Sequence, residues 1–163
     1  MPNWCENRIS LIHDDPEMIN RAEKAFKEGR FLEEFIPFPD GKWDYDWCVE
    51  NWGTKWDVKG GEFEITESEP SGGSGFFDSA WGPPIEAMRK LTELGFDVVL
   101  YYYESGVGFV GKYSSDDDDE SYNVDFSDEN WADNVDEELI EEFDLKTEYE
   151  NWLEYYKEEE DEP

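Results

Sequence analysis

Positively charged side chains are scarce in this chain of 163 residues. It has 13 lysines and arginines against 45 aspartates and glutamates, and its formal net charge is -32. Binding to nucleic acid through phosphates requires a cation for each phosphate contact, and anionic membranes attract basic segments. The composition therefore excludes ordinary nucleic-acid binding and argues against a membrane partner. It favours a basic partner, a load of cations or a strongly solvated surface.

Cysteine and histidine are also rare, because Cys5, Cys48 and His13 are the only ones. A structural zinc site usually takes four Cys or His ligands in close pairs, and the two cysteines form no C-x-x-C pair. No serine has the G-x-S-x-G surroundings of a hydrolase nucleophile. We expect no metal, no cofactor and no catalytic activity. We interpret the cysteines as buried thiols, with zinc binding or redox chemistry as the alternatives.

Long apolar runs are missing. No run approaches the roughly 18 residues of a membrane span, and the N-terminus lacks the basic and apolar regions of a secretory signal. We expect a soluble, cytoplasmic protein whose cysteines stay reduced. Aromatic residues, by contrast, make up 17% of the chain and include 8 Trp. Disordered chains are poor in aromatics, so the sequence predicts a packed core.

The negative charge is concentrated towards the C-terminal end. After Lys112 there are 23 acidic residues and 2 basic ones, so about two thirds of the net charge lies in the last third of the chain. This distribution predicts a globular body over residues 1–112 and an acidic extension over residues 113–163.

Periodicity predicts seven elements in the body. Alternating apolar residues indicate five strands, and apolar stripes with Pro at the start and Gly at the end indicate two helices. A turn or flexible loop is expected at 70–75, and a hydrophobic connector at 30–41. The expected strands are 7–14, 61–69, 76–81, 96–105 and 107–114, and the expected helices are 14–29 and 84–95.

The order of these elements defines the expected fold. The first six match the ferredoxin-like pattern, an α+β fold in which two split βαβ units form an antiparallel sheet with both helices on one face. The last strand extends this sheet. In the acidic extension, residues 114–134 look irregular, and apolar spacings over 135–143 and 145–156 predict one or two amphipathic helices that dock on another surface.

Three short motifs carry a family resemblance: "MPNWCENRI", "WCVENWGTKWD" and "AWGPPIEAM". Together they resemble the Api-like group, a ferredoxin-like domain family of unknown function found in phages, conjugative plasmids and enterobacteria. The resemblance covers roughly residues 1–112. It implies a ferredoxin-like body and a mobile-element setting, but no activity or site residue. The stretch beyond Lys112 lies outside the pattern.

Tryptophans surround the two cysteines. One interpretation is structural, in which six of them fill the open face of a small sheet. The functional alternative is a ligand pocket lined by aromatic rings. The candidates for this pocket are Trp4, Trp47, Trp52, Trp56 and Trp81.

An acidic run follows the body. Clustered carboxylates are typical calcium ligands, but the glycine and the spacing of an EF-hand loop are absent. We interpret the run as a solvated, mobile loop, with calcium binding as the alternative. Its members are Asp116, Asp117, Asp118, Asp119 and Glu120.

The last part of the extension has the charge density of a nucleic acid. Between Asp136 and Asp161 there are 13 acidic residues and 2 lysines. In one continuous helix this would be roughly one net charge per 3.5 Å, against about one per 3.4 Å along a DNA strand. The candidate phosphate mimics are Asp136, Glu137, Glu138, Glu141, Glu142, Glu148, Glu150 and Glu154.

Two functions are compatible with these features. The first is a non-catalytic phage or mobile-element protein that mimics DNA and inhibits a basic, nucleic-acid-binding host defence protein by competing for its basic groove. The second is a protein-interaction module whose aromatic sheet recognises a partner or assembles a homo-oligomer, with the acidity serving solubility. Deleting residues 113–163 would abolish the first activity and spare the second.

Overall fold

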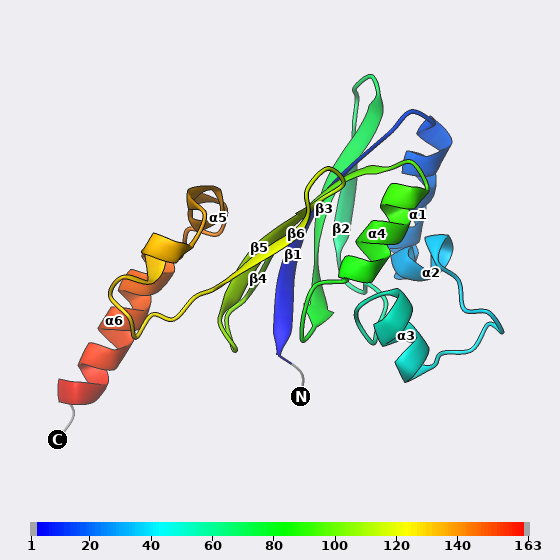
Figure 1. Ribbon diagram of the computed structural model, residues 1–163. Coiled ribbons are helices and arrows are strands. Elements are labelled where there is room, and N and C mark those ends of the chain that lie inside the picture. Colours follow the sequence, from blue (N-terminus) through cyan, green and yellow to red (C-terminus); the bar gives the residue numbers. More distant parts are fainter. Residues whose placement is uncertain (1–2, 162–163) are drawn as a thin grey trace.

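The computed structural model describes residues 3–161 and contains one antiparallel sheet. The strands are β1 (Trp4–His13), β2 (Glu62–Thr66), β3 (Ser71–Ala80), β4 (Asp97–Glu104), β5 (Phe109–Ser114) and β6 (Asp118–Asn123). Their order in the sheet is β2-β3-β1-β4-β5-β6, and the helices that precede β5 in the chain lie on one side of the sheet while the C-terminal helices lie on the other (Figure 1).

The first four strands and two of the helices form the ferredoxin-like unit. Helices α1 (Pro16–Glu28) and α4 (Ile85–Glu93) pack on the same face of the sheet (Figure 1). The Asp15 carboxylate accepts the backbone N–H of Glu17 at the start of α1, and Gly29 ends the helix with φ of 71°, which glycine adopts without strain. The predicted fold class and the predicted helices on one face are confirmed.

The helix-side core is larger than the expected pattern because two short helices join it. The connector contains α2 (Phe31–Phe35) and α3 (Tyr45–Asn51). The Asp57 carboxylate accepts the backbone N–H groups of Leu32 and Glu33, at 2.8 and 2.9 Å, and so supplies the missing partners at the start of α2. Both cysteines are buried, free thiols in this core, as their structural interpretation predicts.

Strand β3 includes the residues that the sequence predicts as a loop. The glycine-rich stretch 71–75 pairs with both β1 and β2, so the loop prediction is wrong. A Cβ at Gly73 would lie 2.5 Å from the Phe63 ring, and one at Gly75 would lie 2.1 Å from the Glu62 carbonyl oxygen. The glycines therefore serve the close approach of β2 and its phenylalanine rather than a turn.

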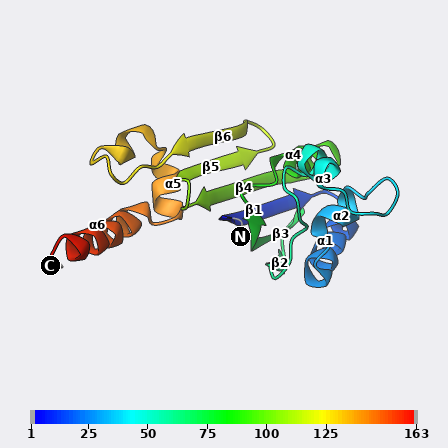
Figure 2. The ribbon, with the colours of Figure 1, turned by 90° about the horizontal axis from the view of Figure 1, so that it is seen from below.

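The C-terminal third continues the sheet and then crosses to its other face. Strand β5 runs through residue 114, and β6 pairs with it where the sequence predicts an irregular stretch. A 3-10 turn, η1 (Trp131–Asn134), leads to α5 (Glu137–Glu142) and α6 (Leu145–Asp161). Viewed from below, α5 lies beside the β4–β6 half of the sheet and α6 points away from it (Figure 2).

A second core holds this segment in place. Val135, Leu139 and Phe143 are buried against Tyr103 and Val110 of the sheet. The predicted apolar spacing therefore identifies the docking face correctly, and the two phases correspond to two helices. No helix among residues 3–161 has the length and apolar character that crossing a membrane requires.

Candidate functional site

One half of the sheet has an uncovered face. In β1, Cys5 and Ile9 point into the helix-side core, whereas Trp4, Glu6 and Arg8 point to the opposite face. Helix α5 covers that face only over β4 to β6 (Figures 1 and 2). The outward side chains of β1, β2 and β3 therefore form the floor of a groove that α5 and the start of α6 border.

We call this depression the acidic groove. It has a volume of about 1030 Å³, and its lining contains six carboxylates and one guanidinium. Aromatic rings of Trp4, Phe76, Tyr101 and Tyr103 lie among these charges. The carboxylates are those of Glu6, Glu62, Glu64, Asp78, Glu142 and Glu148, and the guanidinium is that of Arg8.

Most of the carboxylates in the groove have no cationic partner. Arg8 forms ion pairs with Glu6 at 3.3 Å and with Glu142 at 3.2 Å. Among the described side chains, no cation pairs with the other four carboxylates. Burial, and secondarily the charge of Glu6, raises the pKa of Asp78. The carboxylates therefore give the groove a negative electrostatic potential, which its own cationic side chain neutralises only to a small extent.

Arg8 also holds α5 on the sheet. Its guanidinium donates to the backbone carbonyl of Glu142 at the C-terminal end of α5 and lies 4.7 Å from the centre of the Phe143 ring. A cation at a helix C-terminus is favourable. The sequence did not identify this residue because its partners on and beside α5, Glu142 and Phe143, lie more than 130 positions away. The one available signal was a rare arginine on an open strand face.

The eight candidate phosphate mimics divide into two groups. Glu138 accepts a hydrogen bond from Tyr101 at 2.6 Å and lies 3.3 Å from the Lys112 ammonium. These contacts lower the pKa of Glu138. Glu142 pairs with Arg8, and Asp136 caps α5 by accepting the N–H of Glu138. The other five are exposed carboxylates for which the described side chains provide neither an ion pair nor a hydrogen bond. They are Glu137, Glu141, Glu148, Glu150 and Glu154.

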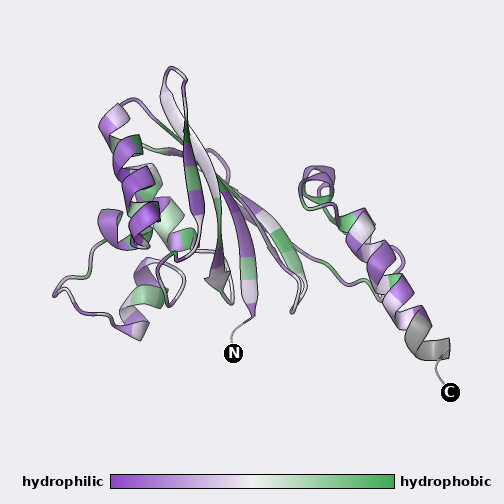
Figure 3. Ribbon diagram, turned by 180° about the vertical axis from the view of Figure 1, so that it is seen from behind, coloured by the Kyte–Doolittle hydropathy of each residue, from purple (hydrophilic) through white to green (hydrophobic). Residues whose placement is uncertain are grey.

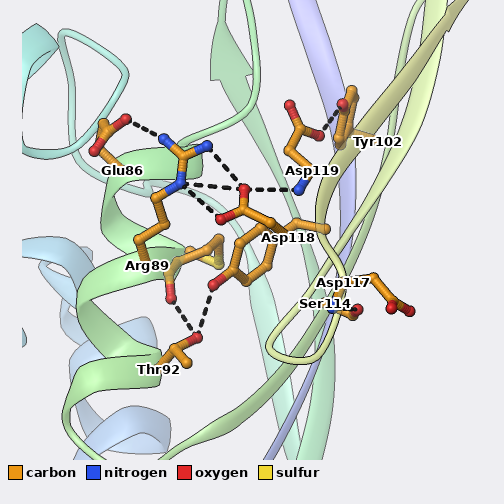
Figure 4. A network of polar contacts seen from close by, with 10 residues as sticks. Glu86, Arg89, Thr92, Tyr102, Ser114, Asp117, Asp118 and Asp119 are labelled. Carbon is orange, nitrogen blue, oxygen red and sulfur yellow. Dashed lines mark hydrogen bonds and ion pairs between the residues drawn. The ribbon is translucent and has the colours of Figure 1, made fainter.

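The acidic run 116–120 forms the β5–β6 turn and the start of β6, not a free loop. The Asp118 carboxylate accepts hydrogen bonds from two N–H groups of Arg89 on α4, and the shortest joins Nη2 to Oδ1 at 2.8 Å (Figure 4). Arg89 also forms an ion pair with Glu86. Asp119 accepts the hydroxyl of Tyr102 (Figure 4). These contacts orient the carboxylates towards protein donors. Over the described residues, no group of three or more His, Cys, Asp or Glu is placed to hold a metal ion.

The tryptophans do not fill a sheet face. Trp52 is 1% exposed, but Trp4, Trp43, Trp56 and Trp81 are between 42% and 55% exposed, so the structural interpretation is wrong for these four. The buried ring anchors the connector because its Nε1 donates to the Ile36 carbonyl at 3.0 Å.

A second cavity, which we call the aromatic pocket, gathers several of these rings. It has a volume of about 600 Å³ and is lined by Trp4, Trp43, Trp52 and Trp56. The structure thus brings together three of the five predicted pocket residues and adds Trp43. The other two predicted residues do not line it: Trp47 packs on Trp52 and Phe38 in the core, and Trp81 lies outside.

The architecture and the comparisons with known proteins agree. The fold defines a ferredoxin-like α+β domain. The chain belongs to the family described as the ferredoxin-like domain in Api92-like protein, whose model matches residues 42–161. That description names no activity. The match includes the acidic segment, so the expectation that the stretch beyond Lys112 lies outside the family pattern is wrong.

One similar solved structure is the crystal structure of a protein Api92 from Yersinia pseudotuberculosis. It is 18% identical to this chain, with a TM-score of 0.40, and the alignment covers 58% of this chain and 40% of that one. The chain thus spans less than half the length of that protein. No curated protein matches the chain.

Proposed function

We propose that this protein is a non-catalytic binding protein whose acidic groove takes a basic segment of a partner protein. One observation carries the proposal: four unpaired carboxylates face a groove that also contains exposed aromatic rings. A lysine or arginine side chain gains both from the carboxylates and from the face of an aromatic ring. The negative potential would also raise the rate of encounter with a basic partner.

The proposed partner is a nucleic-acid-binding protein, which the chain inhibits by occupying the surface that otherwise contacts phosphates. Nucleic-acid-binding proteins carry the basic patches that an acidic surface matches. The resemblance to a group found in phages and conjugative plasmids gives such inhibition of a host protein a biological setting. The mechanism is competition, and it needs no catalytic residue.

Charge density argues that α6 alone is a poor copy of DNA. It carries seven acidic residues and two lysines over 17 residues, or about 26 Å. This is roughly one net charge per 5 Å, against about one per 3.4 Å along a DNA strand. The denser value expected from sequence assumed a single helix, whereas the chain breaks at Asp144, which has φ of 49°. We therefore place the main contact in the groove and assign α6 a supporting role.

The groove unites the two functions expected from the sequence. The sheet face supplies the floor with its aromatic rings, and the acidic extension supplies the wall with Glu142 and Glu148. Hydrophilic residues make up much of α6 where it projects beyond this wall (Figure 3). An inhibitor of a basic protein and an interaction module on a ferredoxin-like sheet would use the same surface.

The test uses a lysine octapeptide as the probe in calorimetric titrations at 50 and 200 mM NaCl. We expect the double variant Glu62→Gln/Glu64→Gln to weaken binding at least about tenfold, because two unpaired carboxylates of the groove are neutralised. The matched control is Glu50→Gln/Glu67→Gln, which removes the same charge from exposed positions outside the groove. Equal losses in the two double variants would show that only net charge matters, and would overturn the proposal.

A further inference from the structure

We propose that the aromatic pocket is a second, separate binding site, and that it takes an organic ammonium group. The site lies beside the acidic groove and shares Trp4 and Asp78 with it, but its remaining lining is its own. The proposal does not depend on a protein partner, because a small free cation would bind even if the groove binds no peptide.

Exposed indole rings are the first observation. Trp4, Trp43 and Trp56 are each about half exposed and line one cavity. Large apolar side chains that remain exposed together mark an interaction surface. The buried Trp52 ring also lines the cavity. A volume of about 600 Å³ falls in the range of small-ligand sites.

The second observation is that one of these rings already has an ammonium group in contact with its face. The Lys55 Nζ lies 4.1 Å from the centre of the Trp56 ring, which is within cation–π distance. The indole face at this position is therefore electrostatically suited to a positive nitrogen, and a ligand could use the neighbouring indole faces in the same way.

The third observation is the charge of the lining. Asp78 and Glu33 contribute carboxylates, and none of the ion pairs among the described side chains involves Asp78. Asp57 lines the pocket as well, but its oxygens accept backbone N–H groups of α2 and Val58. Lys59 is the one cation that the described residues place in the lining. Carboxylates and aromatic faces without an excess of cations select positive ligands over neutral and negative ones.

The walls of the pocket are held in place before any ligand binds. The Trp43 Nε1 donates to the Lys55 carbonyl at 2.8 Å, which fixes the loop before α3 against the segment after it. The rings of Trp4 and Trp56 contact each other at a centroid distance of 6.0 Å. A site that needs little rearrangement loses less entropy on binding.

The test compares choline with its neutral carbon isostere, 3,3-dimethyl-1-butanol, by calorimetric titration of the full chain. The two probes have nearly the same shape, so their difference reports the charge. We expect choline to bind at least about tenfold more tightly than the alcohol. Equal binding of the two probes, or no binding of choline, would overturn the proposal.

Variants at one wall separate the π face from other effects. Trp43→Phe and Trp43→Leu both remove the indole N–H, but only the first keeps an aromatic ring. We expect Trp43→Leu to weaken choline binding about 5- to 30-fold and Trp43→Phe to weaken it less. Trp81→Leu, which removes a similarly exposed ring outside the pocket, should leave binding unchanged. If the leucine variants at 43 and 81 behave alike, the pocket is not the site.

Charge variants give effects of opposite sign, which damage to the fold would not. Asp78→Asn should weaken choline binding, whereas Lys59→Gln should strengthen it about two- to threefold because it removes the competing cation. Lys24→Gln on helix α1, at an exposed position that does not line the pocket, is the matched control. Weaker binding in the Lys59 variant would contradict the proposed electrostatics.

A last comparison identifies the source of the ammonium. If Trp43→Leu also weakens binding of the lysine octapeptide, the pocket takes a side chain of the peptide that lies in the groove. If it weakens choline binding only, the pocket serves a free small cation. Loss of peptide binding in the Glu62→Gln/Glu64→Gln variant with choline binding retained keeps the two proposals independent.

Discussion

Truncating Leu139 tests whether the acidic segment is part of the folded body. The Leu139 side chain is 2% exposed in the second core. Leu139→Ala removes three carbon atoms, each worth about 0.8 kcal/mol when buried, and leaves a cavity with a further cost. We expect the free energy of unfolding to fall by about 3 kcal/mol, a large share of the roughly 5–15 kcal/mol of an ordinary domain.

The assay is unfolding in urea, monitored by far-ultraviolet circular dichroism. Leu153→Ala is the control, because this residue lies on the projecting helix α6 and is 43% exposed; its cost should stay below about 0.5 kcal/mol. If Leu139→Ala costs no more than Leu153→Ala, α5 does not pack on the sheet in solution and the wall of the acidic groove is lost with it.

Three further predictions concern contacts elsewhere. Arg8→Ala should lower the free energy of unfolding by about 1–2 kcal/mol, since it removes a charged hydrogen bond and a cation–π contact; an unchanged urea midpoint would refute the docking role. Burial raises the pKa of Cys5 to about 12, so at pH 8 a thiol reagent should react with it about 10³-fold more slowly than with an ordinary cysteine, and rapid native labelling would contradict the structure. Asp118→Asn should cost less than about 1 kcal/mol, because both partners of its ion pair are more than one-third exposed. Arg89 lowers the pKa of Asp118, so this contribution is present at neutral pH and disappears as the pH falls through the folded-state pKa, and an equal cost at pH 7 and pH 2 would speak against the ion pair.

Local signals sufficed for the ferredoxin-like unit. The Asp15 cap, the proline after it and Gly29 fix the ends of α1, and each acts within a few residues. The alternation of apolar and polar residues in β1 and β4 indicates a sheet with one face covered by helices. The order of the elements along the chain then allows only a few topologies for this sheet. These features are readable because their causes lie close together in the chain.

The segments that the sequence predicts wrongly owe their structure to residues that are distant in the chain. The glycines of β3 are required by Phe63 on the neighbouring strand, whereas a glycine-rich stretch alone has the signature of a loop. Strand β6 is acidic and has little apolar character, and it forms because it pairs with β5 and because Arg89 and Tyr102 bind its first carboxylates. Composition cannot show such partners.

The candidate sites were only partly predictable for the same reason. The sequence identifies the acidic and aromatic residues, but it does not show that α5 turns back over the sheet and forms one wall of a groove. The sequence also does not reveal that most of the tryptophans are exposed, because a large aromatic residue usually indicates a core position. The groove exists because Arg8 on β1 contacts Glu142 on α5, which lies 134 residues later in the chain.

The location of a bound basic peptide tests the central claim most directly. The nitrogen-15-labelled protein is titrated with the lysine octapeptide, and the backbone amide chemical shifts are recorded at each step. The shift changes map the contact residue by residue. We predict that the largest changes lie on the open strands around Glu64, Ser74 and Phe76, with small changes on α1 and α4. Changes spread evenly over all acidic segments, or concentrated on the helix-covered side, would contradict a groove built to bind a basic partner.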